Sequence, residues 1–326
     1  MALLDVRNLS VDARRGSRDI RILDDVSFAL GEGEMLGIVG ESGSGKSVSV
    51  RATLGLIPSP PLHVAAGTAM FEGQDLLRLT SRQRRAILGK RISIVFQDPL
   101  AALNPLMSVG DQIAEAIRAH TSPSKDAVEA RVVELLAAVR IPDPAGRARR
   151  YPHELSGGMR QRVLIAIALA NDPAVLIADE PATALDVTIQ AQIMRIFRDI
   201  RRTRGCAIIL ISHDLGLIAE NCDRVQVMYA GRVVESGTID EVLRNPRHPY
   251  TSGLMKARPD QEVACVTLTP IRGRAPTLGE IPFGCAFHPR CDLYRGRERC
   301  EREKPALLGD GNRLAACHYA DEVDAP

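Results

Sequence analysis

A glycine-rich turn between an apolar run and a helix constrains this chain more than any other feature of its sequence. Residues 40–47 read GESGSGKS, which fits the spacing G-x-x-x-x-G-K-S/T, and the apolar run 35–39 leads directly into them. Glycines let backbone N–H groups curl around phosphate oxygens, and the N-terminus of the following helix adds a partial positive charge. In this motif the lysine reaches the β- and γ-phosphates and the final hydroxyl is a Mg²⁺ ligand. We therefore predict a nucleotide phosphate site formed by Gly40, Glu41, Ser42, Gly43, Ser44, Gly45, Lys46 and Ser47.

A second apolar run ends in two adjacent carboxylates. Residues 175–180 read VLIADE. Alone, the two acids could simply cap the next helix. Beside a phosphate loop, we interpret Asp179 as a Mg²⁺ ligand and Glu180 as the general base that orients and activates water.

Apolar runs alternate with helical patterns along much of the chain. The runs 35–39 and 175–179 are each followed by a helical pattern, and a further run, CAIILIS, ends just before His213. Such alternation predicts an α/β fold with a parallel sheet, whose ligands bind at the carboxyl ends of the strands. Residues 1–39 contain additional short β-like runs, and residues 104–150 have mainly helical periodicity.

Four further motifs identify a family resemblance. Residues 155–161 read LSGGMRQ, which resembles the LSGGQ motif of ATP-binding cassette (ABC) proteins with Met159 in place of the usual Gln. Gln97 in VFQDP precedes this segment, and Ala184-Leu185-Asp186 and His213 follow it in the order of the family's D-loop and switch histidine. The resemblance implies an ABC-type nucleotide-binding domain: a RecA-like parallel-sheet core, an antiparallel β subdomain and a helical subdomain.

The same resemblance assigns roles to individual residues. It implies a dimer that binds ATP between its subunits, with Ser156, Gly157 and Gly158 acting in trans on the γ-phosphate held by the partner. It also implies that Gln97 senses Mg²⁺ and water, that His213 contacts the γ-phosphate and that Asp186 belongs to the D-loop. The predicted Mg²⁺ ligands are thus Ser47, Asp179 and Gln97. One feature departs from the family: no aromatic residue precedes Phe28 to stack on adenine, and Arg14, Arg15 and Arg18 occupy that stretch.

Two later segments narrow the resemblance to the oligopeptide and dipeptide permease group. They are NPRHPYT at residues 245–251 and GCAFHPRC at residues 284–291. This group implies import of di- or oligopeptides with a second, related ATPase subunit, two transmembrane permease subunits and an extracytoplasmic binding protein. The alternatives are nickel or glutathione as cargo, or a soluble ABC ATPase that acts on nucleic acid.

Charge and hydropathy agree with an accessory membrane subunit. The net charge of +2 argues against a nucleic-acid partner. There is no apolar run of the roughly 18 residues that span a bilayer, and the first residues lack a signal-peptide pattern. We therefore expect a peripheral protein on the cytoplasmic face of the plasma (inner) membrane.

The last part of the chain has a composition of its own. We predict a cassette over residues 1–245, with its helical subdomain at about 100–160, and a small Cys-rich extension over 246–326. The extension's cysteines follow the spacing C-x₅-C-x₈-C-x₁₆-C, without the paired CxxC knuckles typical of zinc. A [4Fe–4S] cluster is our first interpretation, with zinc or plain thiols as alternatives, and the predicted ligands are Cys285, Cys291, Cys300 and Cys317. Their distance in sequence from the phosphate loop suggests a structural or docking role. Cys206 and Cys222 are expected to be buried structural thiols.

Overall fold

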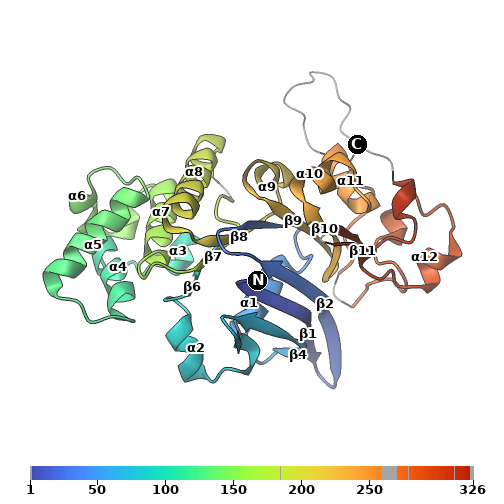
Figure 1. Cartoon of the computed structure of the whole chain (residues 1–326), viewed down its shortest axis with the longest axis horizontal. Helices are drawn as coiled ribbons and strands as arrows, with labels where there is room; N and C mark the ends of the chain where they lie inside the picture. The colour runs from blue at the N-terminus through green and yellow to red at the C-terminus, as the bar shows by residue number, and fades with distance from the viewer. Residues whose placement is uncertain (1, 184, 258–269, 278, 312, 324–326) are drawn as a thin grey trace. The chain divides into compact units, whose positions relative to one another are not determined.

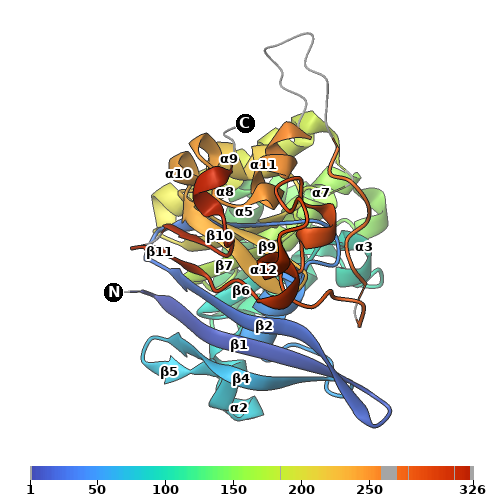
Figure 2. The same cartoon turned by 90° about the vertical axis from the view of Figure 1, so that its right-hand side faces the viewer.

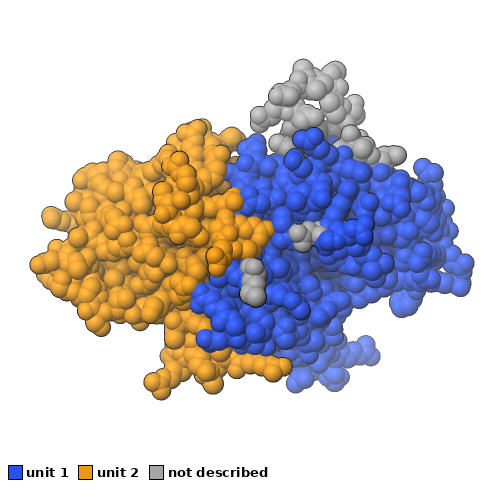
Figure 3. All heavy atoms as spheres, viewed as in Figure 1, with its two compact units in different colours: residues 1–30, 35–77, 212–326 blue, residues 31–34, 78–211 orange. Residues whose placement is uncertain are grey.

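The chain divides into two compact units. The computed structural model describes residues 2–183, 185–257, 270–277, 279–311 and 313–323 (Figure 1). The first unit comprises Met1–Leu30, Met35–Leu77 and Ser212–Pro326, and the second comprises Gly31–Glu34 and Arg78–Ile211 (Figure 3). Neither this division nor the fold tests the predicted boundary at residue 245, which stays a prediction.

An antiparallel sheet forms one part of the first unit (Figure 2). Its strand order is β2-β1-β4-β5, and its strands are β1 (Leu4–Arg15), β2 (Arg18–Leu30), β4 (Leu62–Phe71) and β5 (Gln74–Asp75). Strands β1 and β2 form a long hairpin in which Leu4 pairs with Leu30 and Arg15 with Arg18. Leu4 and Val6 are buried with the period of two of a strand, and Leu9 and Val11 are buried after a register shift between Val6 and Leu9.

A second set of strands in the first unit carries the phosphate loop. Strand β3 pairs in parallel with β9, and the neighbours that follow, β10, β12 and β11, are all antiparallel. These strands are β3 (Met35–Val39), β9 (Arg224–Tyr229), β10 (Arg232–Thr238), β11 (Leu308–Asp310) and β12 (Arg313–Ala315). Strands β9 and β10 form an antiparallel hairpin with Gly231 in its turn. The last two strands come from the extension, so the end of the chain widens a sheet that contains β3.

The helices of the first unit are mostly short. They are α1 (Lys46–Thr53), η1 (Leu76–Arg78), α9 (Leu215–Asn221), α10 (Ile239–Arg244), α11 (Pro249–Lys256), η3 (His288–Arg290), α12 (Glu298–Arg302) and η4 (Ala320–Glu322).

The second unit combines three parallel strands with helices. Their order is β8-β7-β6, and they are β6 (Ile92–Val95), β7 (Val175–Asp179) and β8 (Ala207–Ser212). All residues of β7 and β8 are buried, which explains their continuous apolar sequences. The helices are α2 (Ser81–Ile87), α3 (Pro99–Ala102), α4 (Val109–Arg118), α5 (Lys125–Ala138), α6 (Pro144–Ala148), η2 (Pro152–Glu154), α7 (Gly157–Ala168) and α8 (Val187–Arg204).

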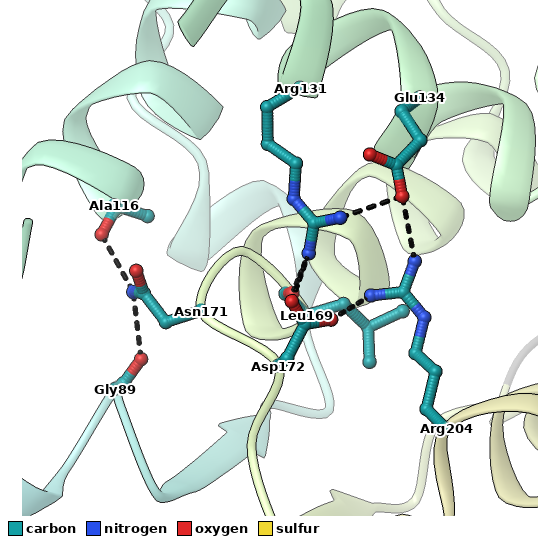
Figure 4. Close-up of polar contacts among 8 residues, drawn as sticks. All are labelled: Gly89, Ala116, Arg131, Glu134, Leu169, Asn171, Asp172 and Arg204. Carbon is teal, nitrogen blue, oxygen red and sulfur yellow. Dashed lines mark hydrogen bonds and ion pairs between the residues drawn. The ribbon is translucent and has the colours of Figure 1, made fainter. Parts of the chain in front are cut away.

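A polar network joins the helical part of the second unit to its strands (Figure 4). Arg131 of α5 contacts Glu134 at 2.6 Å and Asp172 at 2.7 Å, and Arg204 at the end of α8 pairs with the same two carboxylates. The amide of Asn171 donates to the carbonyl oxygens of Gly89 and Ala116, at 3.0 and 2.9 Å. The turn before β7 thereby anchors α4, α5 and α8 together. Within the described residues, no helix is both long and apolar enough to cross a membrane.

Candidate nucleotide site and cysteine-rich tail

The phosphate loop connects a buried strand to a helix, as its sequence predicts. Strand β3 is buried throughout, and α1 begins at Lys46. Two of the loop's glycines are required by close approach of the rest of the unit. A Cβ atom on Gly40 would lie 2.2 Å from the carbonyl oxygen of Met228, and one on Gly45, where φ is +101°, would lie 2.7 Å from a methyl group of Leu23. A larger residue at Gly40 would have to move the backbone, and one at Gly45 would be strained by the positive φ and would displace the Leu23 side chain.

Lys46 is held against the backbone of its own loop. Its Nζ donates to the carbonyl oxygens of Gly40 at 2.7 Å and Glu41 at 3.0 Å, and the residue is only 4% exposed. Ser47 follows it in the first turn of α1. The loop therefore determines where the ammonium lies, and any shift of the backbone at residues 40–41 moves the lysine with it.

The side chains of Glu180, Gln97 and Thr183 meet at the end of β7 in the second unit. Asp179 ends the strand and is 1% exposed, and Glu180 follows it with a positive φ of +50°. The Glu180 carboxylate accepts from the Gln97 amide at 3.1 Å and from the Thr183 hydroxyl at 3.0 Å. Left-handed backbone at a non-glycine residue costs about 1–3 kcal/mol and is typical of functional positions. The structure therefore brings Gln97 and Glu180 together.

Thr183 is a contact that the sequence reasoning missed. Its hydroxyl and the Gln97 amide together fix the orientation of the Glu180 carboxylate. Its position three residues after Glu180, in the turn that follows the strand, is the only signal in the sequence that could have indicated it.

Ser156 caps helix α7. Its hydroxyl accepts from the backbone N–H of Met159, and Ser156 and Gly157 are both exposed at the N-terminus of the helix. Gly158 is buried instead, and a Cβ atom there would lie 2.8 Å from the Ile189 side chain of α8. The two glycines thus have different physical roles: one lies open at the helix end, and the other permits close packing.

Asp186 and His213 belong to different units. Asp186 is the N-cap of α8, where its carboxylate accepts from the N–H of Ile189 at 2.9 Å. His213 is exposed, follows β8 and belongs to the first unit with the phosphate loop, whereas Asp186, Gln97, Asp179, Glu180 and residues 156–158 belong to the second. The arginines found where an adenine-stacking aromatic was expected lie at the tip of the β1–β2 hairpin, and Arg14 pairs there with Asp19.

The segment NPRHPYT is built around a buried acid. Glu235 of β10 accepts from the backbone N–H groups of Arg247 at 2.6 Å and His248 at 3.1 Å. Burial raises the pKa of Glu235 to about 7, and burial lowers the pKa of His248 to about 3. Neutral His248 in turn caps α11, because its Nδ1 accepts from the N–H of Tyr250 at 3.1 Å. The segment is therefore a structural anchor for α11.

The four cysteines of the extension line one small cavity. The cavity measures about 10 Å³ and is also bordered by aromatic and histidine side chains. Burial raises the pKa of all four thiols, to about 11 for Cys291 and about 12 for Cys317. The backbone N–H of Tyr319 donates to the sulfur of Cys317 at 3.4 Å, whereas the N–H groups of His288 and Tyr294 donate to the carbonyl oxygens of Cys285 and Cys291.

These donors bear on what the cavity could hold. Neutral thiols accept hydrogen bonds weakly, so an array of N–H groups around sulfur suits thiolates such as those that bind metals. One such donor, the N–H of Tyr319 to the Cys317 sulfur, is present. In the part of the chain that the structure describes, however, no three Cys, His, Asp or Glu side chains are placed to hold a single metal ion. Cys206 and Cys222 are buried, as expected, and burial raises the pKa of Cys206 to about 12.

The fold is that of ATP-binding cassettes of known structure. A dimeric post-hydrolysis state of the cassette MJ0796 bound to ADP and Pi matches with a TM-score of 0.65 and 26% identity, over 72% of this chain and 98% of that one. The cassette cbiO1 of Clostridium perfringens matches with a TM-score of 0.63 and 28% identity, over 74% of this chain and 90% of that one. Fold and phosphate loop thus define an ABC-type ATPase.

Sequence comparisons narrow this class. The ABC transporter family model matches residues 23–183, and the model for the C-terminal region of oligopeptide/dipeptide transporters matches residues 234–300. The chain is 47% identical to the dipeptide transport ATP-binding protein DppD of Escherichia coli, over 100% of this chain and 99% of that protein. It is 48% identical to the oligopeptide transport ATP-binding protein OppD of Bacillus subtilis, over 97% and 87%. The chain therefore belongs to the ABC transporter family, in its group of dipeptide and oligopeptide transport ATPases.

Proposed function

We propose that this chain is the ATP-binding and ATP-hydrolysing subunit of an importer for di- or oligopeptides. One observation carries the proposal: the chain resembles dipeptide and oligopeptide transport ATP-binding proteins from end to end, including the C-terminal region that follows the cassette. A soluble ATPase acting on nucleic acid would need no such region, and the net charge of +2 gives it no electrostatic attraction to a polyanion. Nickel or glutathione remains the alternative cargo.

The chemistry assigned to the chain is ATP hydrolysis. Residues 40–47 bind the phosphates, and Ser47, Asp179 and Gln97 would hold Mg²⁺, which supplies positive charge to the phosphate oxygens. Glu180 accepts the proton of the attacking water. The hydrogen bonds from Gln97 and Thr183 support this role, because they hold the carboxylate in one orientation. His213 contacts the γ-phosphate, and Asp186 lies in the loop that joins the catalytic carboxylate to α8.

The proposed assembly is a dimer of ATPases docked on a permease. Ser156, Gly157 and Gly158 act on the nucleotide bound by the partner, which the exposed N-terminus of α7 supports. The partner is a related, non-identical ATPase chain. Two transmembrane permease subunits and an extracytoplasmic substrate-binding protein complete the importer, and the chain lies at the cytoplasmic face of the plasma (inner) membrane.

We also propose that Cys285, Cys291, Cys300 and Cys317 bind a [4Fe–4S] cluster. The cavity that the four cysteines share and the N–H group that donates to Cys317 support thiolate ligation. A cluster holds its thiolates farther apart than one tetrahedral zinc ion, whose sulfurs lie roughly 3.8 Å apart at a Zn–S distance of about 2.3 Å. Zinc is the alternative. The polar extension has little apolar material of its own, so either group would stabilise its fold.

The test is reconstitution of the importer in lipid vesicles. The chain would be co-expressed with the ATPase, permease and binding-protein genes that neighbour its own gene, and ATP hydrolysis would be measured with peptides, nickel or glutathione. Stimulation by di- or oligopeptides, lost when Glu180 is replaced by Gln, is the expected result. Stimulation only by nickel or glutathione would change the cargo. Stimulation of the isolated chain by DNA or ribosomes would contradict the transport function.

A further inference from the structure

The second residue of the phosphate loop has partners that phosphate binding does not explain. The carboxylate of Glu41 is held by both terminal nitrogens of Arg290, at 2.6 and 2.9 Å. The backbone N–H of Glu41 donates to the hydroxyl of Tyr250 at 2.8 Å. The loop motif leaves this position variable, and a carboxylate beside bound phosphates would repel them unless it were neutralised. Both partners lie in the extension, beyond residue 245.

Arg290 is fixed as firmly as a residue of the core. Its side chain is only 6% exposed, and its Nε donates to the carbonyl oxygen of Arg272 at 2.8 Å. Its guanidinium lies 5.7 Å from the ring centre of Tyr229 and 5.9 Å from that of Phe287. The hydrogen bonds to Glu41 raise the pKa of Arg290. A two-pronged arginine–carboxylate pair of this kind, mostly shielded from water, gives a defined geometry.

The residues around Arg290 connect the loop with the cysteine cavity. Arg290 directly precedes Cys291, which lines that cavity. Phe287 packs against Tyr229 and Tyr250, with ring centres 5.3 and 5.4 Å apart. Met228, which precedes Tyr229 in β9, lies against Gly40, because a Cβ atom on Gly40 would be only 2.2 Å from its carbonyl oxygen. The extension and the phosphate loop therefore pack together, although they lie far apart in the sequence.

We propose that Arg290 and Tyr250 are positioning residues that clamp Glu41, so that the extension sets the conformation of the phosphate loop and its affinity for ATP. The mechanism follows from the contacts of Lys46. Its ammonium is held by the carbonyl oxygens of Gly40 and Glu41, so fixing the backbone at Glu41 also fixes the lysine. The clamp also neutralises the Glu41 carboxylate. The proposal rests on ATP binding at residues 40–47 and goes beyond it.

Because the clamp both fixes the loop and neutralises the Glu41 carboxylate, substitutions of Arg290 and of Glu41 should weaken ATP binding to different extents. Arg290→Ala removes the neutralising charge and leaves a bare carboxylate in the loop, so ATP binding should weaken by about tenfold, which corresponds to 1.4 kcal/mol. Glu41→Gln removes that carboxylate, and its affinity should fall by only about threefold. The double variant Glu41→Gln/Arg290→Ala should bind ATP more tightly than Arg290→Ala alone, because interacting residues give non-additive effects.

The experiment is titration of the full chain with ATP and Mg²⁺ by calorimetry, followed by steady-state ATP hydrolysis. Arg299→Ala is the matched control, since Arg299 lies in the same extension and pairs with exposed Glu303, away from the phosphate loop in sequence. The metal content and melting temperature of each variant show whether the extension remains folded. Glu41→Gln, made in the loop itself, tests the clamp even where Arg290→Ala unfolds the extension. Clamp variants should raise the KM for ATP and leave kcat at saturating ATP within about twofold.

Two outcomes would overturn the clamp. One is ATP affinity within twofold of the unmodified chain in both single variants, and the other is strictly additive effects in the double variant. A failure of ATP binding at residues 40–47, on which the clamp rests, looks different, because the unmodified chain would then not bind ATP at all.

Discussion

At the scale of single residues, the Glu180 carboxylate that follows β7 is held in one orientation by its backbone and by two neighbouring side chains. Glu180 combines a positive φ with hydrogen bonds from Gln97 and Thr183. The sequence predicts the carboxylate, because two acids follow an apolar run. It does not predict Thr183, because contacts across a turn depend on backbone angles that no residue pattern specifies.

Glu180→Gln tests the proposed base. Glutamine keeps the shape and the contact with Gln97 but cannot accept a proton, so ATP turnover should fall by roughly 10²–10⁴-fold. ATP affinity, measured by titration, should stay within a few-fold. Turnover equal to that of the unmodified enzyme would show that another group activates water.

Substitutions of Gly157 and Gly158 distinguish contact with an anion, expected at Gly157, from close helix packing, expected at Gly158. Gly158→Ala brings a Cβ atom to 2.8 Å from Ile189 and should destabilise the protein by about 1–3 kcal/mol. Gly157→Ala is the matched control for packing, because its Cβ would meet only Leu185 at 3.8 Å, so stability should be unchanged while ATP hydrolysis falls. Denaturant unfolding and turnover measure the two effects. Equal stability of both variants would refute the packing role of Gly158.

At the scale of elements, the predictions follow burial. Strands β7 and β8 were predictable as apolar runs because every residue in them is buried. The helical pattern that follows the apolar run 175–179 is helix α8, which runs from Val187 to Arg204. The role of NPRHPYT was not predictable, because its explanation is Glu235 on a different element. The clamp on Glu41 was hidden for the same reason: its partner Arg290 is 249 positions away in the sequence.

The Glu235 anchor of α11 predicts a pH dependence of stability. The pKa of Glu235 is about 7 in the folded protein, above its ordinary value of 4.5, so the native state binds the proton more tightly. The contribution of Glu235 to stability is therefore complete below about pH 4.5 and is lost as the pH rises through 7. The slope between these values should be at most about 1.4 kcal/mol per pH unit. Unfolding free energies of the unmodified chain and of Glu235→Gln, measured from pH 5 to 8, should diverge in slope. Parallel curves would contradict the raised pKa.

At the scale of the whole molecule, the chain joins an ATPase cassette to a cysteine-rich extension. Much of the architecture could be predicted, since the motifs occur in order and the comparisons confirm the family. The content of the cysteine cavity could not, because spacing alone does not distinguish iron from zinc. The missing adenine-stacking aromatic also stays unexplained, since the arginines in its place lie at a hairpin tip.

Complementation tests the proposed action of the α7 N-terminus in trans. Lys46→Ala and Ser156→Ala chains, each inactive alone, would carry different affinity tags so that mixed dimers can be isolated. A mixed dimer retains one intact composite site and should recover up to about half of the activity of the symmetric dimer. Isolated mixed dimers without activity would show that each chain acts on its own nucleotide.

Anaerobic purification tests the cysteine site. The protein should be brown and contain about four irons per chain. Serine at any of positions 285, 291, 300 or 317 should remove the iron and make the extension sensitive to protease. Cys206→Ala is the control, since that buried thiol lies outside the cavity and its loss should leave the iron in place. One tightly bound zinc ion per chain would show that the site binds zinc and not a cluster. A metal-free protein would exclude both.

The pairing of β10 with β12 has a consequence for biosynthesis. A ribosome synthesises the phosphate loop long before Arg290, which lies 249 positions after Glu41, and before the strand Arg313–Ala315. Contacts between residues so far apart in the sequence form slowly. A domain whose sheet is incomplete exposes unpaired strand edges until the missing strands are synthesised. The nascent chain therefore carries its ATP-binding lysine long before the residues that position it. Until Arg290 has left the ribosome, the nascent chain should therefore bind ATP more weakly than the folded protein.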